Sequence, residues 1–317
     1  MSVVSSLSSR LIPALGVEKG ESGGLKEWFD VGSFVPSIDL EGVVHFDVEH
    51  YDLLVKHINT DYERFALSMA QSLELALGSI NNRIPQSSWR FLILYYSAFY
   101  SAHSILRGVG HFDVNLTKND LSRVNEIIGI YGLKSAQLAS GQYSIQLSFR
   151  DDTGRARLSF GVAGPGKGVH DIFWRNFCDK LSMLAAQAVG RGSADASEFL
   201  SSANQISNLV RTGNADSNSW LADVRNGINY RHEFDTWFPQ NRGSLAFKAE
   251  DDLKFSNSAN IRLDFSRKAQ GIRAFSSVCN YLALIGFEIA DYVAARSSKG
   301  GAFGQRWRRL RELSETF

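Results

Sequence analysis

The sequence of 317 residues lacks the features that mark several large classes of protein. Its only cysteines, Cys178 and Cys279, lie far apart in helix-like apolar segments, which excludes a disulfide scaffold and predicts reduced, buried thiols. Only five prolines occur, and 44% hydrophobic with 21% charged residues is globular composition, which excludes a disordered chain. The 34 Lys and Arg residues are balanced by 33 Asp and Glu, so nucleic acid would have to bind at a local basic patch.

Long hydrophobic runs are also missing. The start, MSVVSSLSSRLIPALG, lacks the basic segment followed by a continuous apolar stretch that a secretory signal requires. The longest apolar stretches are FLILYYSAFYSA and VCNYLALIGFEIADYVAA, which are too short or too interrupted by Asn280, Glu288 and Asp291 to span a bilayer. We therefore expect buried helices in a cytoplasmic protein that does not enter a membrane.

Apolar residues recur every three to four positions along most of the chain, which predicts a mainly α-helical fold. Serine before these runs and glycine or proline after them supply start and stop signals. The expected helices cover residues 51–77, 87–107, 121–132, 170–189, 193–210, 219–238 and 266–295.

Strand patterns are few. SIQLSF and ARLSFGV flank the turn sequence DDTGR and predict a β-hairpin at about 143–162, inserted between helices. A short strand is expected near 43–49, and 243–265 is strand-like. The domain organisation expected is a loosely ordered arm over 1–50, a helical domain over 51–296, and a basic tail over 297–317.

The best candidate for chemistry is a pair of residues in WLADVRNGINYRHEFDTWFP, residues 220–239. Arg225 and His232 are seven residues apart, so on an α-helix they would face within about 20° of each other, with Asn229 between them. An arginine can hold two phosphate oxygens, and a histidine can transfer a proton at neutral pH. The pattern therefore suits metal-free RNA cleavage, in which the 2′-OH attacks the adjacent phosphorus. The structural alternative pairs Arg225 with Asp223 or another carboxylate and buries His232 beside Trp237.

RNGINYRH at 225–232 resembles the R-x(4–6)-H motif of the HEPN superfamily, with Asn226 directly after the arginine. FLILYYSAFYSAHSILRG at 91–108 is similar to the early helix of HEPN domains, which is rich in tyrosine and alanine. The resemblance implies a helical bundle, here with the β-hairpin insertion and small additional strands. It also implies a two-fold homodimer that brings both copies of the motif into one cleft.

The site residues that the resemblance implies are catalytic Arg225 and His232, with Asn226 as the polar neighbour that positions them. Weaker candidates for contacts with substrate are Asn229, Arg231, Tyr100 and His103, together with Ser97 and Ser101. In the early helix, Tyr96, Tyr100, His103 and Arg107 share a face that would line the cleft. For His103 the alternative is a core histidine among tyrosines.

Two other segments offer rival chemistry. GVAGPGKG at 161–168 nearly matches a phosphate-binding loop, but Gly168 replaces the hydroxyl residue that normally binds magnesium. HFDVEH at 45–50 holds histidines and carboxylates, yet its alternation is simpler to explain as a half-buried strand with a solvated face. We expect no metal site and no cofactor.

The tail sequence GQRWRRLRE gathers four arginines around Trp307. It predicts either an RNA contact or, in the favoured interpretation, a basic amphipathic helix docked by Trp307 and Leu310.

The leading functional hypothesis is a metal-independent endoribonuclease acting on RNA, of the toxin or antiphage type that the resemblance implies, with a partner protein that inhibits or activates it. The alternative is a catalytically silent module that binds RNA or a protein through the same face.

Overall fold

The computed structural model describes residues 3–17, 20, 23–78, 87–150, 152–164, 168–211, 219–237, 271–297 and 302–314. These residues form a mostly helical protein with one five-stranded antiparallel sheet. The strand-like segment expected at 243–265 lies outside the described residues, as do residues 165–167 of GVAGPGKG and residues 238–239.

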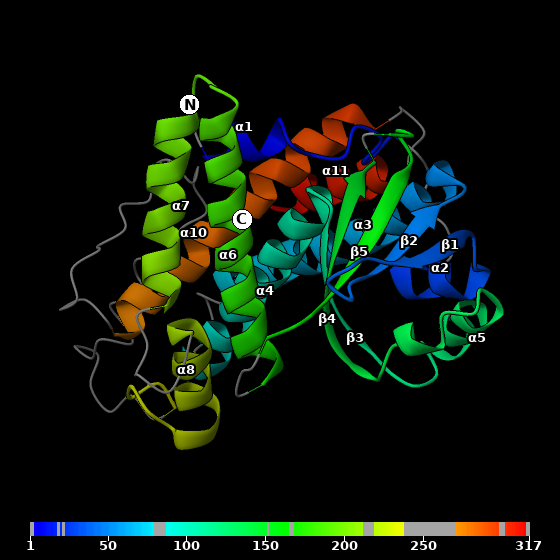
Figure 1. Ribbon diagram of the computed structural model, residues 1–317. Helices are drawn as coiled ribbons and strands as arrows, with labels where there is room; N and C mark the ends of the chain where they lie inside the picture. Colours follow the sequence, from blue (N-terminus) through cyan, green and yellow to red (C-terminus); the bar gives the residue numbers. More distant parts are fainter. Residues whose placement is uncertain are drawn as a thin grey trace.

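The predicted long helices are present with boundaries close to those expected. They are α3 (Tyr51–Gly78), α4 (Ser87–Gly108), α5 (Ser122–Ile130), α6 (Val169–Gly190), α7 (Ala196–Arg211) and α10 (Ile272–Arg296). Figure 1 shows α6 and α7 on one side of α4 and the sheet on the other.

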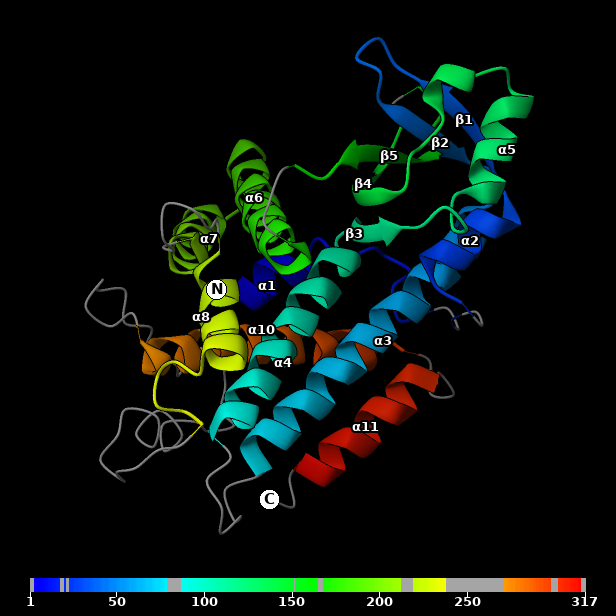
Figure 2. The ribbon, with the colours of Figure 1, turned by 90° about the horizontal axis from the view of Figure 1, so that it is seen from below.

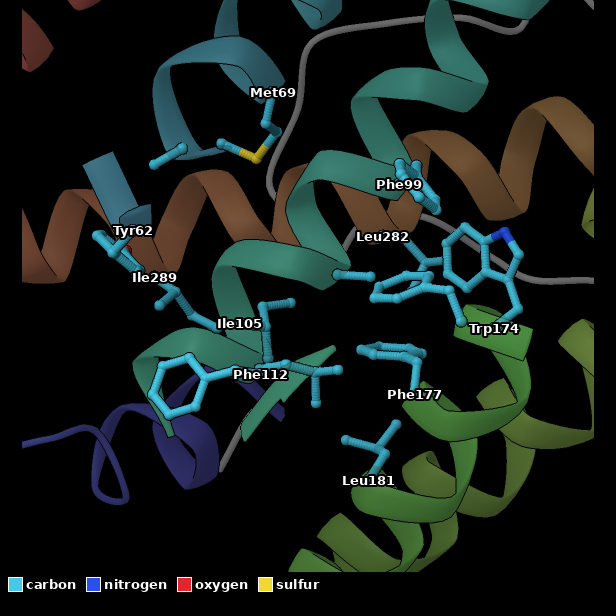
Figure 3. Close-up of a cluster of buried hydrophobic side chains, with 14 of the residues drawn as sticks. Tyr62, Met69, Phe99, Ile105, Phe112, Trp174, Phe177, Leu181, Leu282 and Ile289 are labelled. Carbon is cyan, nitrogen blue, oxygen red and sulfur yellow. The ribbon is translucent and has the colours of Figure 1, made fainter. Parts of the chain in front are cut away.

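Helix α4 lies at the centre of the helical part, where it packs against α3 and α10. The contact is close because small side chains face the neighbouring backbones. Ser97 Oγ donates to the Met69 carbonyl of α3 at 2.9 Å, and Ser101 Oγ donates to the Leu282 carbonyl of α10. At Gly286 of α10, an added Cβ would overlap Ser101. Figure 3 shows the apolar core that α3, α4, α6 and α10 build around this contact.

The sheet has the strand order β1-β2-β5-β4-β3, and every neighbouring pair is antiparallel. Its strands are β1 (Phe34–Ile38), β2 (Val44–Val48), β3 (His111–Leu116), β4 (Gly141–Phe149) and β5 (Ala156–Val162). Alternate residues such as Phe46, Leu158 and Ile145 are fully buried, and Phe29 of α2 (Leu25–Val31) packs on Phe46 and Phe160. One face is therefore core, as is usual for an antiparallel sheet.

The expectation of a loosely ordered N-terminal arm is wrong. Helix α1 (Val3–Ser8) packs on α7 and α10, and Leu7 and Leu15 are buried in the core. The backbone N–H of Ile12 donates to the Gly108 carbonyl at 2.8 Å, which ties the segment to the end of α4. Within residues 1–50, the strand near 43–49 was the only element predicted, and it is present as β2.

The predicted hairpin exists as β4 and β5, but it is not a two-stranded insertion. It forms the middle of the sheet, with β2 beside β5 and β3 beside β4. Strand β3 was not predicted, although HFDVNL at 111–116 alternates polar and apolar residues as a strand does, with the polar His111 and Asp113 among them. Both are buried, since α6 covers this end of the sheet and Asn176 donates to Asp113 at 2.9 Å.

The C-terminal segment is helix α11 (Ala302–Ser314), which runs alongside α3 and contacts α10. Trp307 is buried, packs on Phe287 and donates to Asp291 Oδ1 at 2.7 Å, while Leu310 packs against the core. The interpretation of this tail as a docked amphipathic helix is confirmed, and Arg309 remains exposed.

Helix α10 is the one helix of the described residues with the length and composition to cross a membrane, and 67% of its most apolar window is buried inside the protein. Cys279 on this helix and Cys178 on α6 are buried free thiols, as predicted.

Replacing Trp307 by alanine should lower the free energy of unfolding by about 3–5 kcal/mol, because it removes a buried indole and leaves a cavity between α10 and α11. Arg309→Ala, on the exposed side of α11, should change it by less than about 0.5 kcal/mol. Urea denaturation of both variants measures the difference. Equal stability of the two variants would show that α11 does not dock through Trp307.

Candidate functional site

The segment that carries the predicted motif is not one continuous α-helix to residue 238. Ser219 caps helix α8 (Trp220–Asn226) by accepting a hydrogen bond from the Ala222 N–H at 3.2 Å. The α-helix then changes into a π-helix, η3 (Gly227–Arg231). His232 follows in the left-handed conformation with φ of 53°, so the helical path ends before this residue.

Gly227 is where the helix changes form. The chain turns back on this residue, and the Glu233 N–H donates to the Gly227 carbonyl at 3.1 Å. A Cβ at position 227 would overlap the Glu233 carboxylate and lie 3.0 Å from the Phe234 ring. Phe234 and Asp235 also have positive φ, an uncommon run for residues other than glycine. Consequently the seven-residue spacing of Arg225 and His232 does not place them on one α-helical face.

Arg225 is half-buried between two tyrosines. Its Nη2 donates to the Tyr96 hydroxyl of α4 at 2.6 Å, and its Nη1 donates to Asn226 Oδ1 at 2.9 Å and to the Tyr230 hydroxyl at 3.5 Å. The guanidinium carbon lies 5.7 Å from the centre of the Tyr96 ring and 5.4 Å from that of Tyr230. These contacts fix the position of the cation at the junction of α4, α8 and η3.

No carboxylate contacts Arg225 within the part of the chain that the structure describes, so the pairing with Asp223 that the alternative predicted is not observed. Its Nε is buried without a hydrogen-bond partner among the same residues. The neighbouring Arg231, by contrast, is paired with Glu233 at 2.6 Å. Arg225 therefore presents a positioned cation whose charge is available to an anion.

His232 lies apart from this cation. Its side chain is exposed, and its ring packs on Trp237 with 5.3 Å between ring centres, as the alternative had placed it, but without burial. Trp237 is held in turn by Trp89 of α4 and by a hydrogen bond to the Ile228 carbonyl. No contact joins Arg225 and His232 in the described portion of one chain. The two ends of the motif would need a ligand or a second protomer to act together.

Some of the weaker candidates for contacts with substrate lie near Arg225, and others are buried in the core. Tyr100 adjoins the site through its ring contact with Tyr96, and Asn229 hydrogen-bonds Tyr230. His103 is buried, stacked between Phe65 and Phe173. Burial and the Arg107 charge hold the pKa of His103 well below its ordinary value, so it is a neutral core histidine.

Ser97 and Ser101 are fully buried and donate to helix carbonyls, so they serve packing.

His170, in the first turn of α6, is a site residue that the sequence analysis missed. Its ring centre lies 6.0 Å from that of Tyr96 and 4.6 Å from that of Phe99. Burial and the nearby charge of Arg225 lower its pKa to about 4. Nothing in its spacing along the chain links it to the motif at 225–232.

The structure adds no support for a phosphate-binding loop in GVAGPGKG or for a metal site in HFDVEH. The sheet around GVAGPGKG is antiparallel, unlike the parallel sheet on which phosphate-binding loops sit. In HFDVEH, His45 pairs with Ser159 and Asp39, and Asp47 pairs with Arg150 and Arg157. The described residues contain no group of three or more His, Cys, Asp or Glu side chains that could hold a metal ion.

Comparison with protein-family models, with curated proteins and with solved structures found no match for this chain.

The phenol of Tyr230 should be more acidic than those of other exposed tyrosines, because it contacts Arg225. The hydrogen bond and charge of Arg225 lower the pKa of the Tyr230 phenol below its ordinary value of 10.0. Arg225→Gln should raise this pKa, whereas Arg231→Gln should leave it nearly unchanged, because Arg231 is paired with Glu233. NMR titration of ¹³Cζ-labelled tyrosine measures both. The same Tyr230 pKa in Arg225→Gln and wild type would contradict the placement of Arg225.

Proposed function

We propose that this chain is a HEPN-like, metal-independent endoribonuclease that binds an RNA phosphate at Arg225. The observation that carries the proposal is a half-buried arginine held by hydroxyl and amide groups, with no carboxylate partner among the described residues. The charge of an arginine in an ion pair is already neutralised by a carboxylate, as in the pair of Arg231 with Glu233. A fixed, uncompensated guanidinium is suited to grip phosphate oxygens.

The groups around Arg225 add donors that also suit an anion. The Tyr96 oxygen accepts from Arg225 and has no acceptor for its own hydroxyl hydrogen among the described residues, so this hydrogen can donate to a ligand. The Asn226 amide oxygen likewise accepts from Arg225, and its NH₂ group has no partner in the described part of the chain, so it can also donate to a ligand. Together these side chains form a cluster of donors on one side of a bound phosphate.

In the proposed reaction, a base removes the proton of the ribose 2′-OH, and the 2′-oxygen forms a bond to the adjacent phosphorus. The bond from phosphorus to the 5′-oxygen breaks, and that oxygen takes a proton. The products carry a 2′,3′-cyclic phosphate and a 5′-OH. His232 is the proposed general acid/base, and Arg225 stabilises the charge that builds on the phosphate oxygens.

A homodimer fits the separation of the two groups. Since Arg225 and His232 do not touch within one described chain, RNA bound in a cleft shared by two protomers would bring such groups to one phosphate. The exposure of His232 leaves its ring accessible to that substrate. The HEPN-like motif, the likeness of residues 91–108 and the helical fold support this arrangement. A cytoplasmic toxin or antiphage role, with an inhibitory or activating partner, rests on the resemblance alone.

The second candidate is a silent module that uses the Arg225 surface to bind RNA or a partner protein without cutting. It is favoured by the same lack of contact between Arg225 and His232 among the described residues, because the phosphate-binding cation and the general acid/base would not then act on one phosphate. The two candidates share the binding surface and differ only in the role of His232.

Cleavage of total RNA and tRNA in excess EDTA separates these functions. We expect wild type to leave 2′,3′-cyclic phosphate ends, His232→Ala to cut about 10²- to 10⁴-fold more slowly, and Arg225→Gln about 10²- to 10³-fold more slowly. Arg191→Gln is the matched control: it removes the same charge from the exposed far end of α6, roughly 30 Å from His170 along the helix.

Equal rates of RNA cleavage by wild type and His232→Ala would show that His232 has no role in the reaction. RNA that is bound but left intact by wild type would establish the silent module.

A further inference from the structure

Helix α6 begins beside the aromatic face of α4, and His170 is its second residue. The ring packs against Tyr95, Tyr96 and Phe99, and part of it is exposed. Tyr96, whose ring centre lies 6.0 Å from that of His170, also accepts the hydrogen bond from Arg225, so His170 and the proposed phosphate-binding group adjoin the same tyrosine.

A short chain of hydrogen bonds fixes where the proton of His170 resides. The Trp174 indole N–H, which can only donate, donates to the Tyr95 hydroxyl oxygen at 3.0 Å. That hydroxyl lies 3.0 Å from His170 Nδ1 and is fully buried. Among the described residues His170 Nδ1 is the acceptor available to the Tyr95 hydroxyl hydrogen. Nδ1 therefore accepts, and the single proton of the neutral ring is on Nε2.

His170 remains in this neutral form at physiological pH. Its pKa of about 4 reflects burial first and the Arg225 charge second, so the ring would gain a second proton only in acid. The position of His170 at the positive end of the α6 dipole disfavours the cation further. Nε2 has no hydrogen-bond partner in the described part of the protein. A neutral imidazole N–H of this kind can donate to a charged oxygen without itself losing a proton.

We propose that His170 is a binding residue whose Nε2–H donates to an oxygen of the phosphate held by Arg225. The proposal deepens the proposed function, on which it rests for RNA as the source of that phosphate. His170 cannot serve as the base, because Nδ1 is occupied by Tyr95 and Nε2 already carries its proton. Tyr95 and Trp174 are positioning residues that hold the tautomer.

The test is ¹⁵N NMR of the full-length protein with labelled histidine, in which His170→Gln assigns one of seven imidazole signals. We expect an unprotonated Nδ1 and a protonated Nε2 from pH 5.5 to 8, and a saturable Nε2 shift on adding inorganic phosphate against chloride of equal ionic strength. Tyr95→Phe should lose the single tautomer. A protonated Nδ1, or no phosphate-dependent shift, would overturn the proposal.

A matched pair of variants tests the donor with RNA, using a 2′-O-methyl oligonucleotide that cannot be cleaved. His170→Gln keeps an amide N–H near the position of Nε2 and should bind within about threefold of wild type. His170→Asn is too short to reach the ligand and should bind about tenfold or more weakly, as expected for a lost hydrogen bond to a charged group.

Equal affinity of His170→Asn and wild type would overturn the role of His170 even if the enzyme cuts RNA. The wild-type protein could show the phosphate-dependent shift, and His170→Asn could bind RNA more weakly, although wild type never cuts RNA. That result would support the binding role of His170 and refute only the proposed endoribonuclease activity.

Discussion

The close packing of α4 against α3 and α10 is the constraint on which the rest of the structure depends. The backbones approach so closely that serine, alanine and glycine are needed at the contact, as Ser97, Ser101 and Gly286 show. A larger side chain at any of them would separate the helices and open the core. Large aromatic residues of α4 lie where α6 and α8 approach, among them Phe99 beside Trp174 and Tyr96 beside Arg225. The same helix thus organises the core and supplies the tyrosines of the candidate site.

The candidate site keeps an arginine in a state that folding alone does not favour. A half-buried cation without a carboxylate partner among the described residues costs free energy, whereas Arg150, Arg157 and Arg231 form ion pairs. Tyr96 and Tyr230 offset part of that cost by accepting hydrogen bonds and by presenting their ring faces to the guanidinium. The adjoining π-helix and the left-handed residues after it add local strain. Such departures from regular structure are common at functional sites.

Much of the fold could be predicted because periodicity is a local signal. Helices α3 and α4 show apolar residues every three to four positions, and the DDTGR turn identified β4 and β5. The N-terminal segment was misjudged because Leu7 and Leu15 are buried only by partners distant in sequence. The motif residues were found by their spacing, but the π-helix was not, since Gly227 alone does not specify it. His170 joins the site through tertiary contacts with α4, which a single sequence does not reveal.

The most direct test of the central claim, that the Arg225 charge is available to an RNA phosphate, is the salt dependence of binding to a 2′-O-methyl oligonucleotide. Wild type and Arg191→Gln should give the same slope of log affinity against log salt. Arg225→Gln should bind at least about tenfold more weakly and have a slope smaller by about one, because one phosphate contact is lost. An unchanged affinity and slope in Arg225→Gln would show that Arg225 does not contact the nucleic acid, which contradicts the account.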